Sequence, residues 1–119
     1  MKFAVLVHQA PLVHPASEQA LAFVRAALAA GHQVLRVFFL ADGVHVANRL
    51  SAPPTPETAL VRRWSELAEQ SGVDLVVCST AGLKRGVREA NLAPGFRISG
   101  LGQLAEMVAH ADRVLTFGG

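Results

Sequence analysis

The sequence Phe-Ala-Val-Leu-Val at residues 3–7 is a short and nearly continuous apolar run, which is typical of a β-strand buried on both faces. After a proline-containing loop, an apolar pattern of helical spacing follows, with Ser17 as the predicted N-cap and Gly31 as the stop. Residues 32–40 are rich in Val and Phe and end before the turn-forming pair Asp42-Gly43, which predicts a second buried strand. The two strands and the helix between them therefore predict a β-α-β unit.

The same alternation of strand and helix patterns continues to the end of the chain. The further predicted elements are a short helix at 44–50, a helix at 57–70, a strand at 73–77, a helix at 101–109 capped by Ser99, and a strand at 113–117. This order predicts an α/β fold of three layers, in which a mostly parallel sheet has helices on both faces. In such folds the functional residues lie at the carboxyl ends of strands.

Size and composition limit the classes of protein that the chain can belong to. It has 119 residues, of which 51% are hydrophobic and 17% are charged, so we expect a single domain over residues 1–119. A formal net charge of +2 is too small to predict direct nucleic-acid binding. No apolar run has the length of a signal sequence or a membrane span, so we expect a cytoplasmic protein with no membrane contact. A mean hydropathy of +0.35 is high for so small a chain and predicts an oligomer.

Cys78 is the only cysteine, which excludes an internal disulfide and a multi-thiolate metal site. It directly follows the strand predicted at residues 73–77, and the cations Lys84, Arg85 and Arg88 come soon after it. A helix that began next to the cysteine would, together with these cations, stabilise a thiolate or a persulfide. A cysteine at a strand end is also a common packing residue, so the sequence leaves both a nucleophilic and a structural role open.

The other candidates for chemistry are five histidines, His8, His14, His32, His45 and His110. They show none of the spacings that are typical of a metal site, so no metal is predicted. A hydrolase that pairs Cys78 with His45 or His8 is a weaker hypothesis. It also needs an orienting residue, for which Asp42 and Asn48 are the candidates.

Three further patterns are assigned structural roles. Residues 100–105 match the G-x-G-x-x-A dinucleotide fingerprint, but too little chain follows for a β-α-β unit, so a glycine-permitted turn into the last helix is predicted. The final pair Gly118-Gly119 directly follows a predicted strand, so we do not expect a flexible carboxylate tail. Arg62 and Glu66 belong to an alternating charge pattern that is typical of a solvated helix face.

A set of segments spread over almost the whole chain carries a family resemblance. They are Met1–Val5, Ala29–His32, Val37–Phe39, Asp42–Val44, Ala47–Asn48, Leu60–Val61 with Trp64, Gly72–Val73 leading to Cys78, Lys84–Val87, Gly95–Phe96, Ser99–Gly102, Leu104–Glu106 and Asp112–Val114. With these segments the chain resembles the DsrE/TusD family of sulfur-carrier proteins, in particular its TusD branch.

This resemblance implies a sulfurtransferase that receives sulfane sulfur as a persulfide on Cys78 and passes it to a thiol of a downstream protein. It also implies a hetero-oligomer with TusB-like and TusC-like subunits, a TusA-like donor and a TusE-like acceptor, in a relay toward 2-thiolation of the tRNA wobble uridine. No cofactor is required, and we expect Lys84, Arg85 and helix N–H groups to stabilise the anion. The alternatives are a DsrE-like subunit of a sulfur-oxidation complex and a non-catalytic interaction subunit of the same fold.

Overall fold

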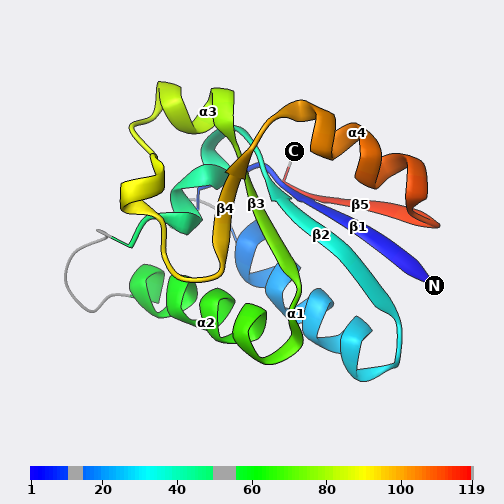
Figure 1. Ribbon diagram of the computed structural model, residues 1–119. Coiled ribbons are helices and arrows are strands. Elements are labelled where there is room, and N and C mark those ends of the chain that lie inside the picture. Colours follow the sequence, from blue (N-terminus) through cyan, green and yellow to red (C-terminus); the bar gives the residue numbers. More distant parts are fainter. Residues whose placement is uncertain (11–14, 50–55, 119) are drawn as a thin grey trace.

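Five parallel strands form one sheet in the computed structural model, which describes residues 1–10, 15–49 and 56–118 (Figure 1). The strands are β1 (Lys2–Val7), β2 (Gln33–Phe39), β3 (Asp74–Cys78), β4 (Phe96–Ser99) and β5 (Arg113–Phe117), in the spatial order β4-β3-β2-β1-β5. The helices are α1 (Ala16–Ala29), α2 (Pro56–Ser71), α3 (Ser79–Lys84) and α4 (Leu101–His110), with 3₁₀ helices η1 (Ala41–Ala47) and η2 (Glu89–Asn91). The predicted α/β fold with a parallel sheet is confirmed.

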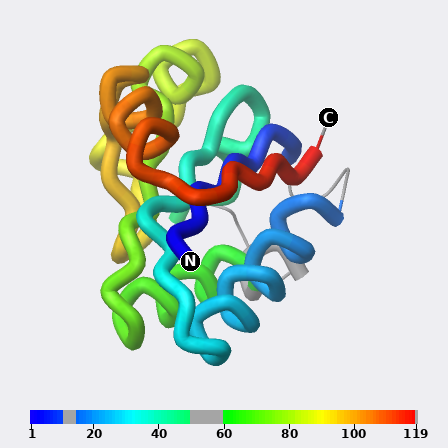
Figure 2. The backbone as a smooth tube through the Cα atoms, turned by 90° about the vertical axis from the view of Figure 1, so that its right-hand side faces the viewer, coloured from blue at the N-terminus to red at the C-terminus, as the bar shows by residue number. Residues whose placement is uncertain are grey.

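The helices lie on both faces of the sheet (Figures 1 and 2). From β1 to β4 each new strand adds beside the last, and α1 and α2 cover one face on the way. The chain then returns past the whole sheet to pair β5 with the free side of β1. Crossovers between parallel strands are right-handed. The connection from β4 to β5 runs across the sheet in the opposite direction to the earlier connections, so it places α4 on the opposite face.

Alternate residues of each strand contribute to two apolar clusters, one on each face of the sheet. The larger cluster lies under α1 and α2 and includes Val5, Leu21 and Trp64. The buried residues of the smaller cluster are Ala4, Phe38, Val76, Cys78 and Met107. Met107 comes from α4, so the cysteine faces the layer that this single helix covers.

Ser17 is not the N-cap of the first helix, as the sequence pattern predicted. Pro15 occupies the cap position without a side-chain hydrogen bond, and Ser17 lies inside the first turn. The Ser17 side chain is fully buried, and its Oγ accepts a 3.0 Å hydrogen bond from Nε1 of Trp64. The serine hydroxyl therefore accepts the hydrogen bond of a tryptophan indole in α2 and does not cap the helix.

Ser99 is also not a helix cap, because it is the last residue of β4, a strand that the sequence analysis missed. The N-cap of α4 is Gly100, which has no side chain to offer. The strand Phe96–Ser99 is short, lies at the edge of the sheet and contains a charged residue. It therefore lacks the apolar run that identified the central strands.

The segment after β2 forms η1, so the short helix predicted at residues 44–50 begins earlier and has 3₁₀ geometry. Leu50 lies outside the described residues. At Gly43 the chain passes so close to the end of β1 that a Cβ would collide with the carbonyl oxygen of Val7. Glycine is required here for close approach, and it fixes η1 against the carboxyl edge of the sheet.

Candidate active site

Cys78 is the last residue of β3 and occupies the N-cap position of α3. Its Cα is paired with that of Ser99 on β4, so two neighbouring strands end side by side at this point. The predicted position of the cysteine at the carboxyl end of a strand is confirmed. The first turn of α3 begins at Ser79, directly beyond the cysteine.

The Cys78 side chain is buried, with only 4% of the residue exposed. It is a free thiol and packs in the apolar cluster that contains Phe38, Val76 and Met107. This environment differs from the cation-rich setting expected from the sequence, and it is the one expected if the cysteine has a packing role. Any reagent that reacts with the sulfur must first gain access to it.

Two exposed apolar side chains lie on the elements that leave the ends of β3 and β4. Leu83 is on α3 and is 73% exposed, and Leu101 begins α4 and is 56% exposed. Apolar side chains exposed singly are common on protein surfaces, and they mark a contact site only where they form a continuous patch. The chain presents apolar groups on both elements next to the buried thiol.

Arg85 pairs with a carboxylate and does not contact the thiol. Its Nε donates a 2.8 Å hydrogen bond to Oδ1 of Asp42, and its Nη1 donates to the carbonyl oxygen of Ala81. The hydrogen bond and the charge of Arg85 lower the pKa of Asp42 below its ordinary value. The pair joins α3 to η1, and Lys84 is exposed to solvent. Among the described residues, neither cation forms a hydrogen bond or ion pair with Cys78.

The histidines do not assemble around the cysteine. His8 and His45 are half-buried, and neither has a hydrogen bond to Cys78 in the described part of the chain. His32 lies beside the amino terminus, with Nδ1 3.2 Å from the terminal nitrogen, and His110 contacts the carbonyl oxygen of Glu106. His14 and Gly119 lie outside the described residues. Within residues 1–10, 15–49 and 56–118 there is no group of three or more His, Cys, Asp or Glu side chains that could hold a metal ion.

The orienting residues considered for a hydrolase have other contacts. Asp42 is bound to Arg85, and Asn48 forms an isolated antiparallel bridge with Leu92. No helix of the described chain is long and apolar enough to cross a membrane. The arrangement around the thiol therefore consists of a strand end, a short helix and an apolar layer.

An ionic cluster that sequence reasoning missed fastens α4 to the sheet at the start of β3. Asp74 accepts two 2.8 Å hydrogen bonds from Arg97 and one 2.8 Å hydrogen bond from Arg36. Arg36 also contacts the carbonyl oxygen of Gln103 and the carboxylate of Glu106, both on α4. The hydrogen bonds from Arg97, and then the one from Arg36, lower the pKa of Asp74 against the opposing effect of partial burial.

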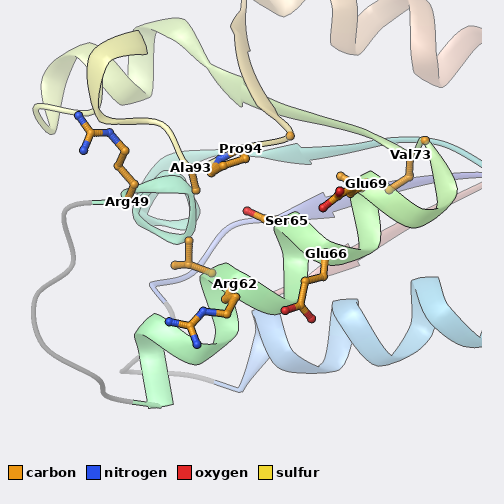
Figure 3. Close-up of a pocket in the computed structure, with 12 residues that line it drawn as sticks. Arg49, Arg62, Ser65, Glu66, Glu69, Val73, Ala93 and Pro94 are labelled. Atoms are coloured by element: carbon orange, nitrogen blue, oxygen red, sulfur yellow. The ribbon is translucent and has the colours of Figure 1, made fainter.

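A second missed feature is a cavity of about 770 Å³ beside α2, which Cys78 does not line (Figure 3). Arg62, which the sequence pattern assigned to a solvated helix face, is one of its lining residues. The sequence feature that could have indicated the cavity is the pair Pro94-Gly95, which is typical of a loop. In the structure Gly95 has a φ of +91° and lies against Ala68. The cavity is on the α2 side of the sheet, and the thiol faces α4.

Comparison with known proteins gives consistent matches over the whole chain. The model of the DsrE/DsrF-like family matches residues 1–117. The chain is 45% identical over 129 aligned positions to a DsrE protein of Allochromatium vinosum, covering 99% of each. It is 48% identical over 112 positions to the sulfurtransferase TusD of Sodalis glossinidius, covering 85% of this chain and 86% of that protein. Its backbone is similar to the crystal structure of the ychN protein from E. coli, with a TM-score of 0.82 and 26% identity, covering 98% of this chain and 100% of that one.

Proposed function

Because the chain belongs to the DsrE/DsrF-like family, we propose that it is a sulfurtransferase that carries sulfur as a persulfide on Cys78. The names of relatives at 40–48% identity indicate a sulfurtransferase. The observation that carries the proposal is the position of the only cysteine, at the carboxyl end of a central strand and next to the start of a helix. This is the edge at which parallel α/β sheets place their functional residues.

The proposed chemistry consists of two exchange steps. The Cys78 thiolate attacks the outer sulfur of a donor persulfide, a new S–S bond forms on Cys78, and the donor leaves as a thiolate. An acceptor thiolate then attacks this outer sulfur, and Cys78 leaves as a thiolate. Each step breaks one S–S bond and forms another, so no external oxidant or reductant is needed. The described part of the chain provides no second thiol, so the sulfur must leave to another molecule.

The burial of Cys78 adds a requirement to this chemistry. The sulfur is packed against Met107 and other apolar side chains, so a donor reaches it only after a local opening. Leu83 and Leu101 lie on the elements beside it and would contact the protein that opens the site. Arg85 could then turn from Asp42 toward the persulfide anion, whereas Lys84 is already free in solvent.

The assembly that we infer is a hetero-oligomer with TusB-like and TusC-like subunits, a TusA-like donor and a TusE-like acceptor, in the cytoplasm. Its product would serve 2-thiolation of the tRNA wobble uridine. The TusD names of several relatives support this pathway. A DsrE-like role in sulfur oxidation is the second candidate, supported by the DsrE relative at 45% identity over 99% of the chain. Both pathways use the same step at Cys78.

Intact-mass spectrometry of the purified protein with glutathione persulfide as the donor tests the proposal. We expect a gain of about 32 Da, one sulfur atom, that is removed by reductant and is absent in Cys78→Ser. Iodoacetamide labelling of the folded and the urea-unfolded protein serves as the accessibility control. If wild type gains no sulfur although its thiol is labelled in the folded state, the sulfur-carrier role is wrong. If wild type gains no sulfur and its thiol is not labelled in the folded state, the alternative of a non-catalytic interaction subunit is favoured.

A further inference from the structure

The short helix α3, at the carboxyl end of β3, is held in place by few and small buried side chains (Figure 1). Of its six residues only Gly82 is buried, and Ala81 is half-buried against the apolar clusters on both faces of the sheet. Its one large apolar side chain, Leu83, is 73% exposed. Segments that bury few apolar contacts open with the smallest change in free energy. Packing alone therefore holds α3 weakly on the sheet.

Cys78 adjoins α3 through both its backbone and its packing. It is the N-cap residue, so its side chain lies beside the first turn of the helix, whose third residue is Ala81. Ala81 also packs against the apolar cluster that contains Cys78. The other helix in this cluster is α4, which the ionic cluster around Asp74 fastens to the sheet. Of the two helices beside the thiol, α3 is therefore the one that can move away at the smaller cost.

An ion pair at the end of α3 adds to this weak packing. Nε of Arg85, the C-cap residue, donates a 2.8 Å hydrogen bond to Oδ1 of Asp42 in η1. Nη1 of the same guanidinium donates to the carbonyl oxygen of Ala81 at 3.1 Å, so one group joins the body of α3 to η1. The Asp42 side chain is 62% exposed. Water can therefore replace the guanidinium on the carboxylate, and the pair can break without leaving a buried charge unpaired.

The η1 side of this pair is fixed to the sheet. Gly43 directly follows Asp42 and lies so close to Val7 of β1 that it has no room for a Cβ. Ala41, directly before Asp42, has a φ of +47° and is the one non-glycine residue with a positive φ in the described part of the chain. A non-glycine residue keeps such a conformation only where the surrounding structure fixes it. Asp42 is therefore the stationary partner of the pair, and Arg85 is the partner that moves.

We propose that α3 is a lid over Cys78 and that the Arg85–Asp42 pair is the latch that keeps it closed. Opening breaks this pair and moves Ala81 away from the thiol, with hinges at Cys78 and at Gly86, whose φ is +75°. It also frees the guanidinium of Arg85 beside the uncovered sulfur. The use of the lid in sulfur transfer rests on the function proposed above, whereas the opening itself can be measured without a sulfur donor.

Iodoacetamide labelling of Cys78 in the folded protein measures the opening. Asp42→Asn removes the charge and keeps the size of the side chain, so labelling should become about two- to fivefold faster, as expected for loss of an exposed ion pair. Glu18→Gln is the matched control, because it removes the acid of another exposed pair, Glu18–Arg63, which joins α1 to α2. That contact is the same with the lid open or closed, so the labelling rate should not change. Equal rates in wild type and Asp42→Asn, or an equal increase in Glu18→Gln, would overturn the proposal.

Labelling in low, non-denaturing concentrations of urea separates the opening of α3 from unfolding of the whole domain. Movement of one short helix exposes little surface, so the labelling rate should rise only slightly with urea. A steep rise would show that the thiol reacts through global unfolding, and the lid would be wrong.

Sulfur uptake from glutathione persulfide distinguishes failure of the lid from failure of the sulfur-carrier role. Asp42→Asn should gain sulfur faster than wild type by the same factor as it is labelled. Faster labelling of Asp42→Asn with no gain of sulfur in either protein would support the lid and contradict the sulfur-carrier role. Equal rates of sulfur gain in the two proteins would show that the lid does not control transfer.

Discussion

The indole Nε1 of Trp64 donates a 3.0 Å hydrogen bond to Oγ of Ser17, and both side chains are fully buried. This bond joins α2 to the first turn of α1 beneath the sheet. A buried indole N–H has no access to water, so the serine hydroxyl is the group that satisfies it.

Ser17→Ala should therefore lower the free energy of unfolding by about 1–3 kcal/mol, because it leaves the indole N–H buried and unpaired. Urea denaturation followed by tryptophan fluorescence measures the change. Ser65→Ala is the matched control, because its hydroxyl has no partner among the described residues. That variant should leave the free energy of unfolding unchanged or raise it slightly, and an equal loss in the two variants would disprove the role of the Ser17 bond.

Met107→Ala should expose Cys78 and destabilise the protein. Met107 is buried and packs in the same cluster as the cysteine, so its truncation leaves a cavity next to the thiol. We expect a loss of about 2–5 kcal/mol in the free energy of unfolding and faster iodoacetamide labelling of the folded protein. Val108→Ala changes the next residue, which is 43% exposed, and should alter neither quantity appreciably. Unchanged labelling in Met107→Ala would mean that this side of the cluster does not control access.

The ionised carboxylate of Asp74 should stabilise the folded protein, and this contribution should be lost in acid, where the carboxylate is protonated. Its pKa is lowered in the folded state, first by the hydrogen bonds from Arg97, so its contribution is present above the ordinary pKa of about 4 and is lost as pH falls through the lower folded value. Asp74→Asn should be less stable than wild type at neutral pH, and the difference should shrink as the pH is lowered below the ordinary pKa of an aspartate into acid. Urea denaturation at neutral and at acid pH measures this. A difference that stays constant with pH would show that ionisation of Asp74 does not contribute.

Gly43 and Gly102 should respond in opposite directions to substitution by alanine. At Gly43 a Cβ would collide with the carbonyl oxygen of Val7, so Gly43→Ala should lower the melting temperature. At Gly102, in the first turn of α4, no atom lies within 4 Å of the added Cβ. Gly102→Ala should therefore be neutral or stabilise by up to about 1 kcal/mol through helix propensity. Thermal unfolding by circular dichroism compares the two, and a stable Gly43→Ala would contradict the close packing of η1 on β1.

Local patterns were enough to predict the architecture where the strands are buried on both faces. The apolar run at residues 3–7 and the strand pattern at 32–40 gave β1 and β2, and Arg113–Phe117 was predicted with its observed bounds. The edge strand β4 was missed because four residues that include a charge carry too little apolar pattern. Both predicted serine caps were wrong, because side-chain pairing with Trp64 and strand pairing with Cys78 took precedence over local capping.

The sequence by itself determined the alternation of strands and helices, the absence of a second thiol, and the position of Cys78 at a strand end, because these depend on residues that are near one another along the chain. Only the tertiary structure decided that Cys78 is buried against Met107, that Arg85 pairs with Asp42, and that Arg49 and Arg62 share one cavity. These relationships join residues far apart in sequence. They follow from the strand order and from the faces on which the helices pack, which local periodicity does not specify.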